Sequence, residues 1–254
     1  MRFLESLMKA ALERPNARVE SLLIGWKGSL TLLSDGRTGL GWAPSFSTGS
    51  TQVRNDIARR LISASAHDLV SLYASPFPQE SAAASAAMAA LCSPEGGLGL
   101  ESLIPLPGDS SVALLDADRP VKETLEDWGW TVTSFGERTG HRRTLPGWTS
   151  TCAASSFRVF WLSGRLVPDG TLRALVPVVP QGSAVIVQGP GIPFVPDVLY
   201  HMGVQYLVLP QIASGAERSC LSHIAAGGDP WLSPHVLWRA FRCVGTDTKD
   251  FGTP

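Results

Sequence analysis

The sequence lacks any apolar run close to the roughly 18–20 residues that a membrane-spanning helix needs, so we expect no membrane span. It also lacks an excess of one charge, because 21 lysines and arginines stand against 22 aspartates and glutamates without basic clusters. This balance argues against nucleic acid as a partner, since sequence-independent binding needs a concentrated cationic face. Charged residues make up only 17% of the chain, which favours a surface covered by a second copy. We therefore expect a homo-oligomer, a dimer.

Export signals and paired cysteine motifs are missing as well. Glu5 and Lys9 interrupt the N-terminal apolar segment, whereas a secretory signal needs an unbroken one. The four cysteines are far apart and form no C-x-x-C pair: Cys92, Cys152, Cys220 and Cys243. A chain of 254 residues, 44% of them hydrophobic, can bury its own core and needs no disulfides. We expect reduced cysteines in a cytoplasmic protein.

The N-terminal part of the chain shows the pattern of an α+β unit. Helical spacing of apolar residues predicts an amphipathic helix over residues 2–13. Three β-type runs follow, with the hairpin signal Asp35-Gly36 between the last two: residues 19–26, 29–33 and 38–42. They predict an antiparallel meander, followed by helices at residues 52–63, 67–73 and 79–91. The last of these is rich in alanine, so neighbouring backbone can approach it closely.

From residue 111 onward, nearly continuous apolar runs alternate with helical segments. Such runs are typical of strands buried on both faces of a parallel sheet, and they cover residues 112–115, 131–135, 158–162, 184–188 and 206–209. Four helices are predicted in this part of the chain, at residues 121–128, 169–176, 196–202 and 216–225. A further edge strand is predicted at residues 235–244. The predicted fold class is α/β, with an α+β domain at residues 1–105 and a Rossmann-like doubly wound parallel sheet at residues 106–254.

Candidate site residues follow the predicted strands, because ligands of open parallel sheets bind beyond the carboxyl ends of the strands. Gly189-Pro190-Gly191 leads from a strand to a helix, so its backbone could form a cradle for an anion. A tight turn that requires glycine explains the same pattern about equally well. Asp116, near Asp118, could bind a ribose, a cation or an amine, although capping of the next helix is the commoner role.

Two further strand ends carry polar candidates. Ser163 and Gly164 could donate hydrogen bonds to a ligand or form a simple strand-to-helix turn. Asp169 is either the N-cap of the next helix or a site carboxylate. Glu137 and His141 share a loop after the second predicted strand and are the metal candidates, while Glu137 or Asp116 would be the acid or base of an enzyme.

Recognised catalytic and metal motifs are few. Cys220 and His223 lie three residues apart on a predicted helix, but packing explains the pair better because no third ligand is near in the sequence. No G-x-S-x-G or H-E-x-x-H occurs, so neither nucleophilic nor zinc-hydrolase chemistry is visible. No G-x-G-x-x-G occurs either, and the chain therefore has no standard NAD fingerprint.

Five segments together resemble those of one protein family. They are Ile24-Gly25-Trp26, Gly39-Leu40-Gly41-Trp42, the alanine-rich residues 80–91, Ser163-Gly164 with Asp169-Gly170-Thr171-Leu172, and Gly189-Pro190-Gly191-Ile192-Pro193-Phe194 followed by Pro196 and Gly203-Val204. The set covers most of residues 18–228 and resembles the bacterial and archaeal family described as "putative heavy-metal chelation" proteins. The resemblance implies an N-terminal domain like that of enolase, a C-terminal Rossmann-like domain and a ligand site between them.

The chain departs from the family pattern at three places in that set. Ala89 and Asp169 stand where the family has Asn, and Gly191-Ile192 replace Ser-Thr. The resemblance therefore implies a site that is altered in ligand or activity. It suggests a transition metal as the class of cofactor, which the residues themselves do not specify.

Three functions are compatible with the resemblance. The first is binding of a small molecule or metal complex in the cleft between the domains, in heavy-metal chelation or metal homeostasis. The second is an enzyme that acts on a small metabolite or a metal-chelating natural product in the same cleft. The third is a degenerate, non-catalytic subunit. The predicted ligand-binding residues are Asp116, Glu137, Ser163, Gly164, Asp169, Gly189, Pro190 and Gly191.

Overall fold

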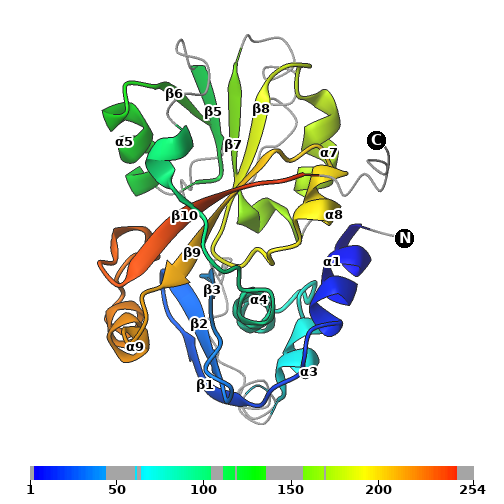
Figure 1. Cartoon of the computed structure of the whole chain (residues 1–254), viewed down its shortest axis with the longest axis vertical. Coiled ribbons are helices and arrows are strands. Elements are labelled where there is room, and N and C mark those ends of the chain that lie inside the picture. The colour runs from blue at the N-terminus through cyan, green and yellow to red at the C-terminus, as the bar shows by residue number, and fades with distance from the viewer. Residues whose placement is uncertain are drawn as a thin grey trace, which may run out of the picture.

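The structure is a computed structural model that describes residues 3–43, 61, 64–103, 111–117, 119–135, 157–168 and 170–244. A small antiparallel sheet and a larger, mostly parallel sheet lie one below the other, with helices around both (Figure 1). This arrangement confirms the predicted α/β fold class. Among the described residues, no helix is both long and apolar enough to cross a bilayer.

The small sheet is the antiparallel meander that the turn signals predict. Its strands β1 (Val19–Ile24), β2 (Gly28–Leu33) and β3 (Thr38–Trp42) are neighbours in chain order. The turn between β2 and β3 contains Gly36 with a φ of +89°, a backbone conformation that side chains with a Cβ rarely adopt. The Asp35-Gly36 signal therefore correctly marks a hairpin.

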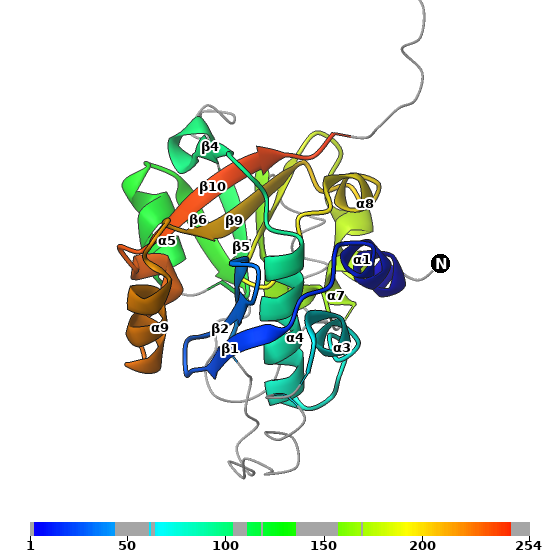
Figure 2. The same cartoon turned by 60° about the horizontal axis from the view of Figure 1, so that its bottom comes forward.

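Helices cover both faces of the small sheet. Helix α4 (Pro78–Leu91) packs against one face, together with α1 (Phe3–Leu12) and α3 (Ala66–Val70) farther out. Helix α9 (Glu217–Ala225), from the far end of the chain, packs against the other face through Cys220 and Ile224 (Figure 2). Apart from Leu61, the helix predicted at residues 52–63 lies outside the described residues.

The large sheet has seven strands in the order β4-β10-β9-β8-β7-β5-β6. The strands are β4 (Leu98–Gly99), β5 (Ser111–Leu115), β6 (Thr131–Phe135), β7 (Val159–Ser163), β8 (Ala184–Gln188), β9 (Tyr206–Ile212) and β10 (Val236–Arg242). Those from β5 to β9 are parallel, whereas β10 and β4 are antiparallel to their neighbours. The parallel part has the order of a doubly wound sheet in which the second strand lies outside the first. This confirms the Rossmann-like half.

The connecting helices leave the sheet on opposite faces. Helix α5 (Arg119–Asp127) contributes Val121 and Leu125 to the core on one face. Helices α7 (Thr171–Leu175) and α8 (Pro196–Tyr200) contribute Leu172 and Leu199 to the core on the other face. Short 3-10 helices complete the connections: η1 (Leu100–Leu103), η2 (Gly164–Leu166), η3 (Val176–Val178) and η4 (Pro230–Leu232).

Strand β9 extends beyond its predicted range, and strand β10 takes another place in the sheet than predicted. Strand β9 continues to Ile212, three residues beyond the predicted end and through Pro210. Proline is tolerated there because β8 pairs with β9 only as far as Val208, so one side of β9 is free of the ladder beyond it. Strand β10 is the predicted tail strand, but it lies between β9 and the two-residue β4 rather than at the edge.

The main hydrophobic core runs without interruption through both parts of the chain. Leu7 of α1, Met88 of α4 and Phe160 of β7 belong to the same buried cluster. A second cluster on the far face of the large sheet contains Trp161 and Trp130, which pack edge to face with 6.4 Å between ring centroids. The division into domains at residues 1–105 and 106–254 stays a prediction.

Candidate functional site

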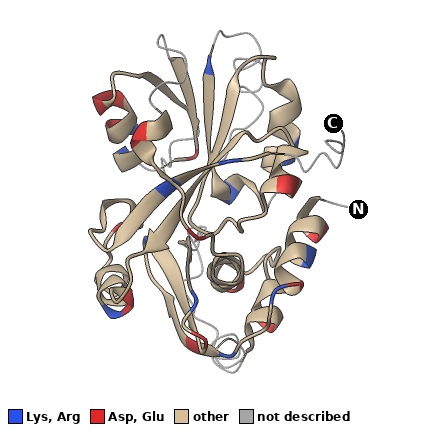
Figure 3. Ribbon diagram, in the orientation of Figure 1, with Lys and Arg blue, Asp and Glu red and all other residues tan. Residues whose placement is uncertain are grey.

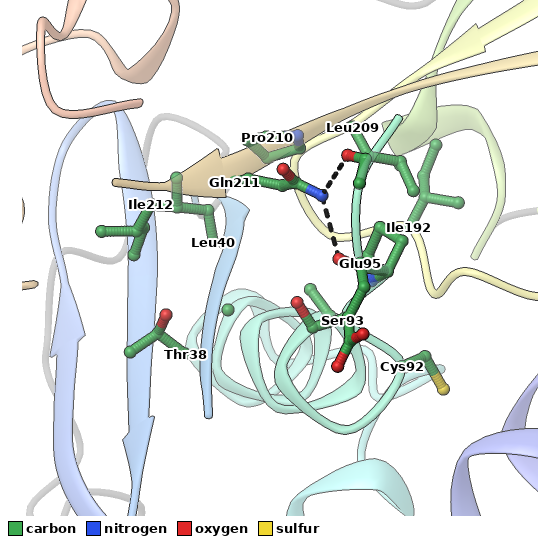
Figure 4. A pocket seen from close by; sticks show the side chains of 14 residues that line it. Thr38, Leu40, Cys92, Ser93, Glu95, Ile192, Leu209, Pro210, Gln211 and Ile212 are labelled. Atoms are coloured by element: carbon green, nitrogen blue, oxygen red, sulfur yellow. Dashed lines mark hydrogen bonds between the residues drawn. The ribbon is translucent and has the colours of Figure 1, made fainter. Parts of the chain in front are cut away.

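A hollow of about 290 Å³ lies where the small sheet and α4 meet the large sheet. Residues from four parts of the chain line it: Thr38, Gly39 and Leu40 of β3, Ala89 and Cys92–Gly96 at the end of α4, Ile192 after β8, and Leu209–Ile212 at the carboxyl end of β9. Figure 4 shows these side chains arranged around the space, with α4 seen nearly end on. A ligand in the hollow would contact both parts of the chain.

The alanine-rich surface of α4 lets β3 form one wall of the hollow at backbone distance. A Cβ atom on Gly39 would lie 2.2 Å from the carbonyl oxygen of Ala86 and from the amide nitrogen of Ala90. Only glycine fits at such a distance. The predicted close approach of backbone to the alanine-rich helix is thus confirmed, and β3 is its partner.

Gln211 holds the segment after α4 against the end of β9. Its Nε2 atom donates hydrogen bonds to the carbonyl oxygens of Pro94 and Gly96, at 2.9 and 3.0 Å (Figure 4). Because the two carbonyls belong to a segment without regular structure, these bonds position one wall of the hollow. No local pattern in the sequence marks Gln211, since its partners lie more than a hundred residues away in the chain.

The charge in the hollow is small and negative. Among the described lining residues, Glu95 is the carboxylate, and none is a lysine or an arginine. Burial raises the pKa of the Cys92 thiol to about 11, although Arg14 acts in the opposite direction. Cys92 is therefore a neutral thiol near pH 7, and its sulfur points away from Gln211 in Figure 4. Elsewhere acidic and basic residues are interspersed along the elements (Figure 3).

The Gly189-Pro190-Gly191 turn connects the two parts of the chain. The N–H of Gly191 donates to the carbonyl oxygen of Leu40 at 2.8 Å, and the N–H of Gly189 donates to that of Val208 at 3.0 Å. The buried Tyr73 hydroxyl donates to the carbonyl oxygen of Gly191 at 3.2 Å. Proline has no N–H, so the three residues have no free amide for an anion cradle. Their geometry matches the tight-turn alternative, and a ligand contact here stays a prediction.

Ile192 fills the space above the ends of β7 and β8. A Cβ atom on Gly164 would lie 2.5 Å from Cγ1 of Ile192, and one on Gly189 would lie 3.1 Å from the same atom. The side chain is only 2% exposed, and it also lines the hollow. Ile192 therefore separates the hollow from the two predicted site residues Gly164 and Gly189.

Asp116 and Ser163 lie at the carboxyl ends of β5 and β7, away from the hollow. Ser163 is buried, and its hydroxyl oxygen accepts a hydrogen bond from the N–H of Arg165 at the start of η2. Asp116 has a φ of +52°, the only positive φ found for a non-glycine residue in the described parts of the chain. Four further predicted or alternative site residues lie outside those parts: Asp118, Glu137, His141 and Asp169.

The described residues contain no group of three or more His, Cys, Asp or Glu side chains that could hold a metal ion. Cys220 is completely buried in the core between α9 and the small sheet. The ring of His223 lies 3.1 Å from the carbonyl oxygen of Asp229. Packing therefore accounts for the Cys220 and His223 pair, as expected. The thiols of Cys92, Cys220 and Cys243 are free and buried, and Cys152 is outside the described residues.

Comparison with known proteins gives a family and a fold. A family model described as "Putative heavy-metal chelation" (DUF364) matches residues 104–231. The chain is similar to the crystal structure of a DUF364 protein with unknown function from Pyrococcus horikoshii, with 16% identity, a TM-score of 0.71 and coverage of 95% of this chain and 100% of that one. A DUF364 protein of unknown function from Desulfitobacterium hafniense gives 17% identity, a TM-score of 0.71 and coverage of 94% and 98%. No curated protein matches the chain significantly.

Proposed function

The chain belongs to the family described as "Putative heavy-metal chelation", and we propose that it binds a small ligand or a metal complex in the hollow beside α4. The observation that carries the proposal is the composition of the hollow's wall, to which β3, the end of α4 and the end of β9 all contribute. Ligand sites are commonly found at such junctions and at the carboxyl ends of parallel strands. In the predicted domain division, this hollow is the cleft between the two domains.

A metal that arrives with its own chelator suits this wall better than a bare ion. A bare transition-metal ion is usually held by three or four protein side chains. The described wall offers one carboxylate, from Glu95, together with the hydroxyls of Thr38 and Ser93. It also offers the amide oxygen of Gln211, whose nitrogen already donates to Pro94 and Gly96. These groups can hydrogen-bond to the outside of a small complex and favour one with positive charge. The volume of about 290 Å³ is near the lower end for ligand pockets, about 300 Å³.

Two departures from the family pattern lie in the wall itself. By the resemblance described above, Ala89 stands where the family has Asn and Ile192 stands where it has Thr. Both residues line the hollow. Each apolar side chain removes a hydrogen-bonding group from the space. This supports a second candidate function, a non-catalytic subunit whose ligand site has lost part of its polar lining.

The test uses the full chain and two probes, nickel chloride and a preformed nickel–histidine complex, in calorimetric titrations. We expect the complex to bind and the bare ion to bind more weakly. Glu95→Gln should weaken binding of the complex by about tenfold, the cost of one charge-assisted hydrogen bond. Glu20→Gln, an exposed position on β1, is the matched control and should leave the affinity unchanged.

Ala89→Asn combined with Ile192→Thr separates the two candidates. If the chain binds metal complexes as it stands, the wild type binds the probe and the double variant changes the affinity. If it is a subunit with a lost site, only the double variant binds. Native mass spectrometry with elemental analysis of the purified protein independently measures any bound metal or ligand. Absence of metal and ligand there, together with no binding by either protein, would contradict both candidates.

A further inference from the structure

Strand β3 lies at the end of the small sheet, so one of its edges pairs with no other strand in the described part of the chain. The N–H of Leu33 donates to the carbonyl oxygen of Arg37, which makes these residues a hydrogen-bonded pair of the β2–β3 hairpin. Because such pairs alternate along antiparallel strands, the backbone N–H and C=O groups of Thr38 and Leu40 are directed away from β2. The bond from the N–H of Gly191 to the carbonyl oxygen of Leu40 agrees with this direction. The hollow is therefore lined by an unpaired strand edge.

The end of β9 has an unpaired edge as well. Strand β8 pairs with β9 only as far as Val208. On the other side of β9, the N–H of Ala213 donates to the carbonyl oxygen of His235 and continues the ladder with β10. By the same alternation, the carbonyl of Pro210 and the N–H of Ile212 are directed away from β10, toward the side that β8 no longer occupies. Both residues line the hollow.

The two unpaired edges border the same hollow but do not pair with each other, because β3 and β9 belong to different sheets. The turn at residues 189–192 lies at one end, where two of its N–H groups donate to carbonyl oxygens of β3 and β9. Figure 4 shows Ile192 on one side of the space and Thr38 and Ile212 on the other. A ligand between them would meet backbone donors and acceptors from two strands.

The charge of the hollow distinguishes the two ends of a peptide. Glu95 is the one carboxylate among the described lining residues, and none of them is a lysine or an arginine. An N-terminal ammonium group would be attracted to Glu95, whereas a C-terminal carboxylate would meet a like charge. Leu40, Ile192 and Leu209 make other parts of the wall apolar, which suits small apolar side chains.

We propose that the hollow binds a short peptide-like ligand of about two residues. Its ammonium group would lie at Glu95, and its amide groups would pair with the unpaired edges of β3 and β9. Strand edges bind extended peptides through such main-chain hydrogen bonds. Two extended residues span about 7 Å, and a space of about 290 Å³ is small for a longer peptide. The inference rests on the proposed function, because it names the class of ligand or chelator that the same hollow takes.

The test titrates metal-free L-alanyl-L-alanine amide into the full chain and measures binding by calorimetry. Two analogues each remove one interaction: an N-acetyl form lacks the ammonium group, and an ester form has oxygen in place of the central N–H. We expect the parent peptide to bind and each analogue to bind about tenfold more weakly. No binding of the parent peptide, or equal affinity for the ester form, would overturn the proposal.

Glu95→Gln tests the position of the ammonium group. In this variant the parent peptide should lose about tenfold in affinity, and the difference between the parent and its N-acetyl form should disappear. Glu20→Gln, at an exposed position on β1, is the matched control and should leave both affinities unchanged. If the difference between the two peptides persists in Glu95→Gln, the ammonium group does not lie at Glu95 and the proposed orientation is wrong.

Amide chemical shifts in NMR spectra test the backbone pairing without any substitution. The N–H signals of Leu40 and Ile212 should shift when the parent peptide is added, since these groups gain hydrogen bonds. The N–H of Leu22 is the control, because the same alternation places it at the outer edge of β1, away from the hollow. Binding of the peptide without a shift at Leu40 or Ile212 would reject the site.

The nickel–histidine titration separates this inference from the proposed function. If the nickel complex binds and the peptide does not, the hollow takes a metal complex and the peptide inference is wrong. If the peptide binds with the expected shifts and the nickel complex does not, the peptide inference holds and the preference for a metal complex is wrong. If neither probe binds, both proposals fail.

Discussion

Ile192 shows how one side chain can set the limits of a hollow. It lines the hollow on one side and covers Gly164 and Gly189 on the other, at distances that leave no room for a Cβ on Gly164. A smaller residue at this position would connect the hollow with the carboxyl ends of β7 and β8. The identity of residue 192 therefore controls both the size and the polarity of the hollow.

Ile192→Ala should lower the free energy of unfolding by about 2–4 kcal/mol, because a buried side chain is lost and a cavity remains. Urea unfolding of the variant and the wild type measures the change. The matched control is Val178→Ala, an exposed position in η3 that is expected to cost about 0.5 kcal/mol or less. Equal small effects at the two positions would show that Ile192 does not seal the space.

At the scale of elements, the contact between β3 and α4 determines how the small sheet meets the rest of the chain. Gly39 and Gly41 let the strand approach the helix, where a Cβ on Gly41 would meet the hydroxyl oxygens of Ser85 and Ser29. The Ser29 hydroxyl lies 2.8 Å from the carbonyl oxygen of Ala82 and 3.1 Å from that of Trp42, and its single proton can be donated to either. Small residues and one bridging hydroxyl thus hold the helix and the sheet together.

Gly39→Ala should destabilise the fold by about 3 kcal/mol or more, because the new methyl group would force β3 away from α4. Gly36→Ala is the comparison, since nothing lies within 4 Å of its Cβ position and only the φ of +89° is unfavourable. Its cost is expected to be about 1–2 kcal/mol. Thermal and urea unfolding measure both, and a cost at Gly39 no larger than that at Gly36 would contradict the close contact.

The segment between α4 and β4 depends on Gln211 for its position. Gln211→Leu removes both hydrogen bonds to Pro94 and Gly96, which together contribute about 1–3 kcal/mol to the local structure. Amide hydrogen exchange in residues 95–97 should become roughly tenfold faster or more. Exchange in the β1–β2 turn serves as the internal control. Unchanged exchange in residues 95–97 would mean that other contacts hold this wall of the hollow.

For the whole molecule, buried thiols make the fold sensitive to alkaline pH. Burial raises the pKa of Cys92 and Cys220 to about 11 and that of Cys243 to about 12, from 9.0. The folded state therefore keeps these protons when the unfolded state has lost them. Their contribution to stability is complete below the unfolded pKa of about 9, declines above it, and is lost once the pH has risen through the folded pKa. Burial also raises the pKa of Tyr73, which extends the effect.

Under reducing conditions, the free energy of unfolding should fall above pH 9 by about 1.4 kcal/mol per pH unit for each buried thiol. Urea unfolding between pH 7 and pH 11 measures this slope. Cys243→Ala removes one of the three described thiols and should make the slope shallower by about one third. A stability that is constant up to pH 11 would show that the thiols are not shielded from water in solution.

The near balance of acidic and basic residues gives the net charge of the molecule but not how the charges are distributed over it. It argued against nucleic acid and favoured a covered surface, and the structure places charges of both signs along the same helices (Figure 3). The homodimer stays a prediction. Sedimentation of the purified chain would test it.

Local patterns were sufficient to predict most of the elements. The strand β8 at residues 184–188, the hairpin at Gly36 and the alanine-rich α4 all follow from signals within a few neighbouring residues. Boundaries failed where tertiary pairing overrode a local signal, as in β9, which continues through Pro210 because β10 pairs with it. The candidate site was harder to predict from the sequence, since Gln211 and Glu95 lie in no local pattern that marks a ligand-binding residue.

By itself, the sequence determined the order of strands and helices, the parallel character of the second half and the resemblance to one family, because these depend on periodicity, turn residues and ordered motifs. Only the tertiary structure decided where a ligand could bind. The hollow combines residues 38–40 with residues 209–212. The tertiary structure also decided that the backbone N–H groups of Gly189 and Gly191 donate to carbonyl oxygens of the protein itself. Such contacts join residues distant in the chain, and no local propensity specifies them.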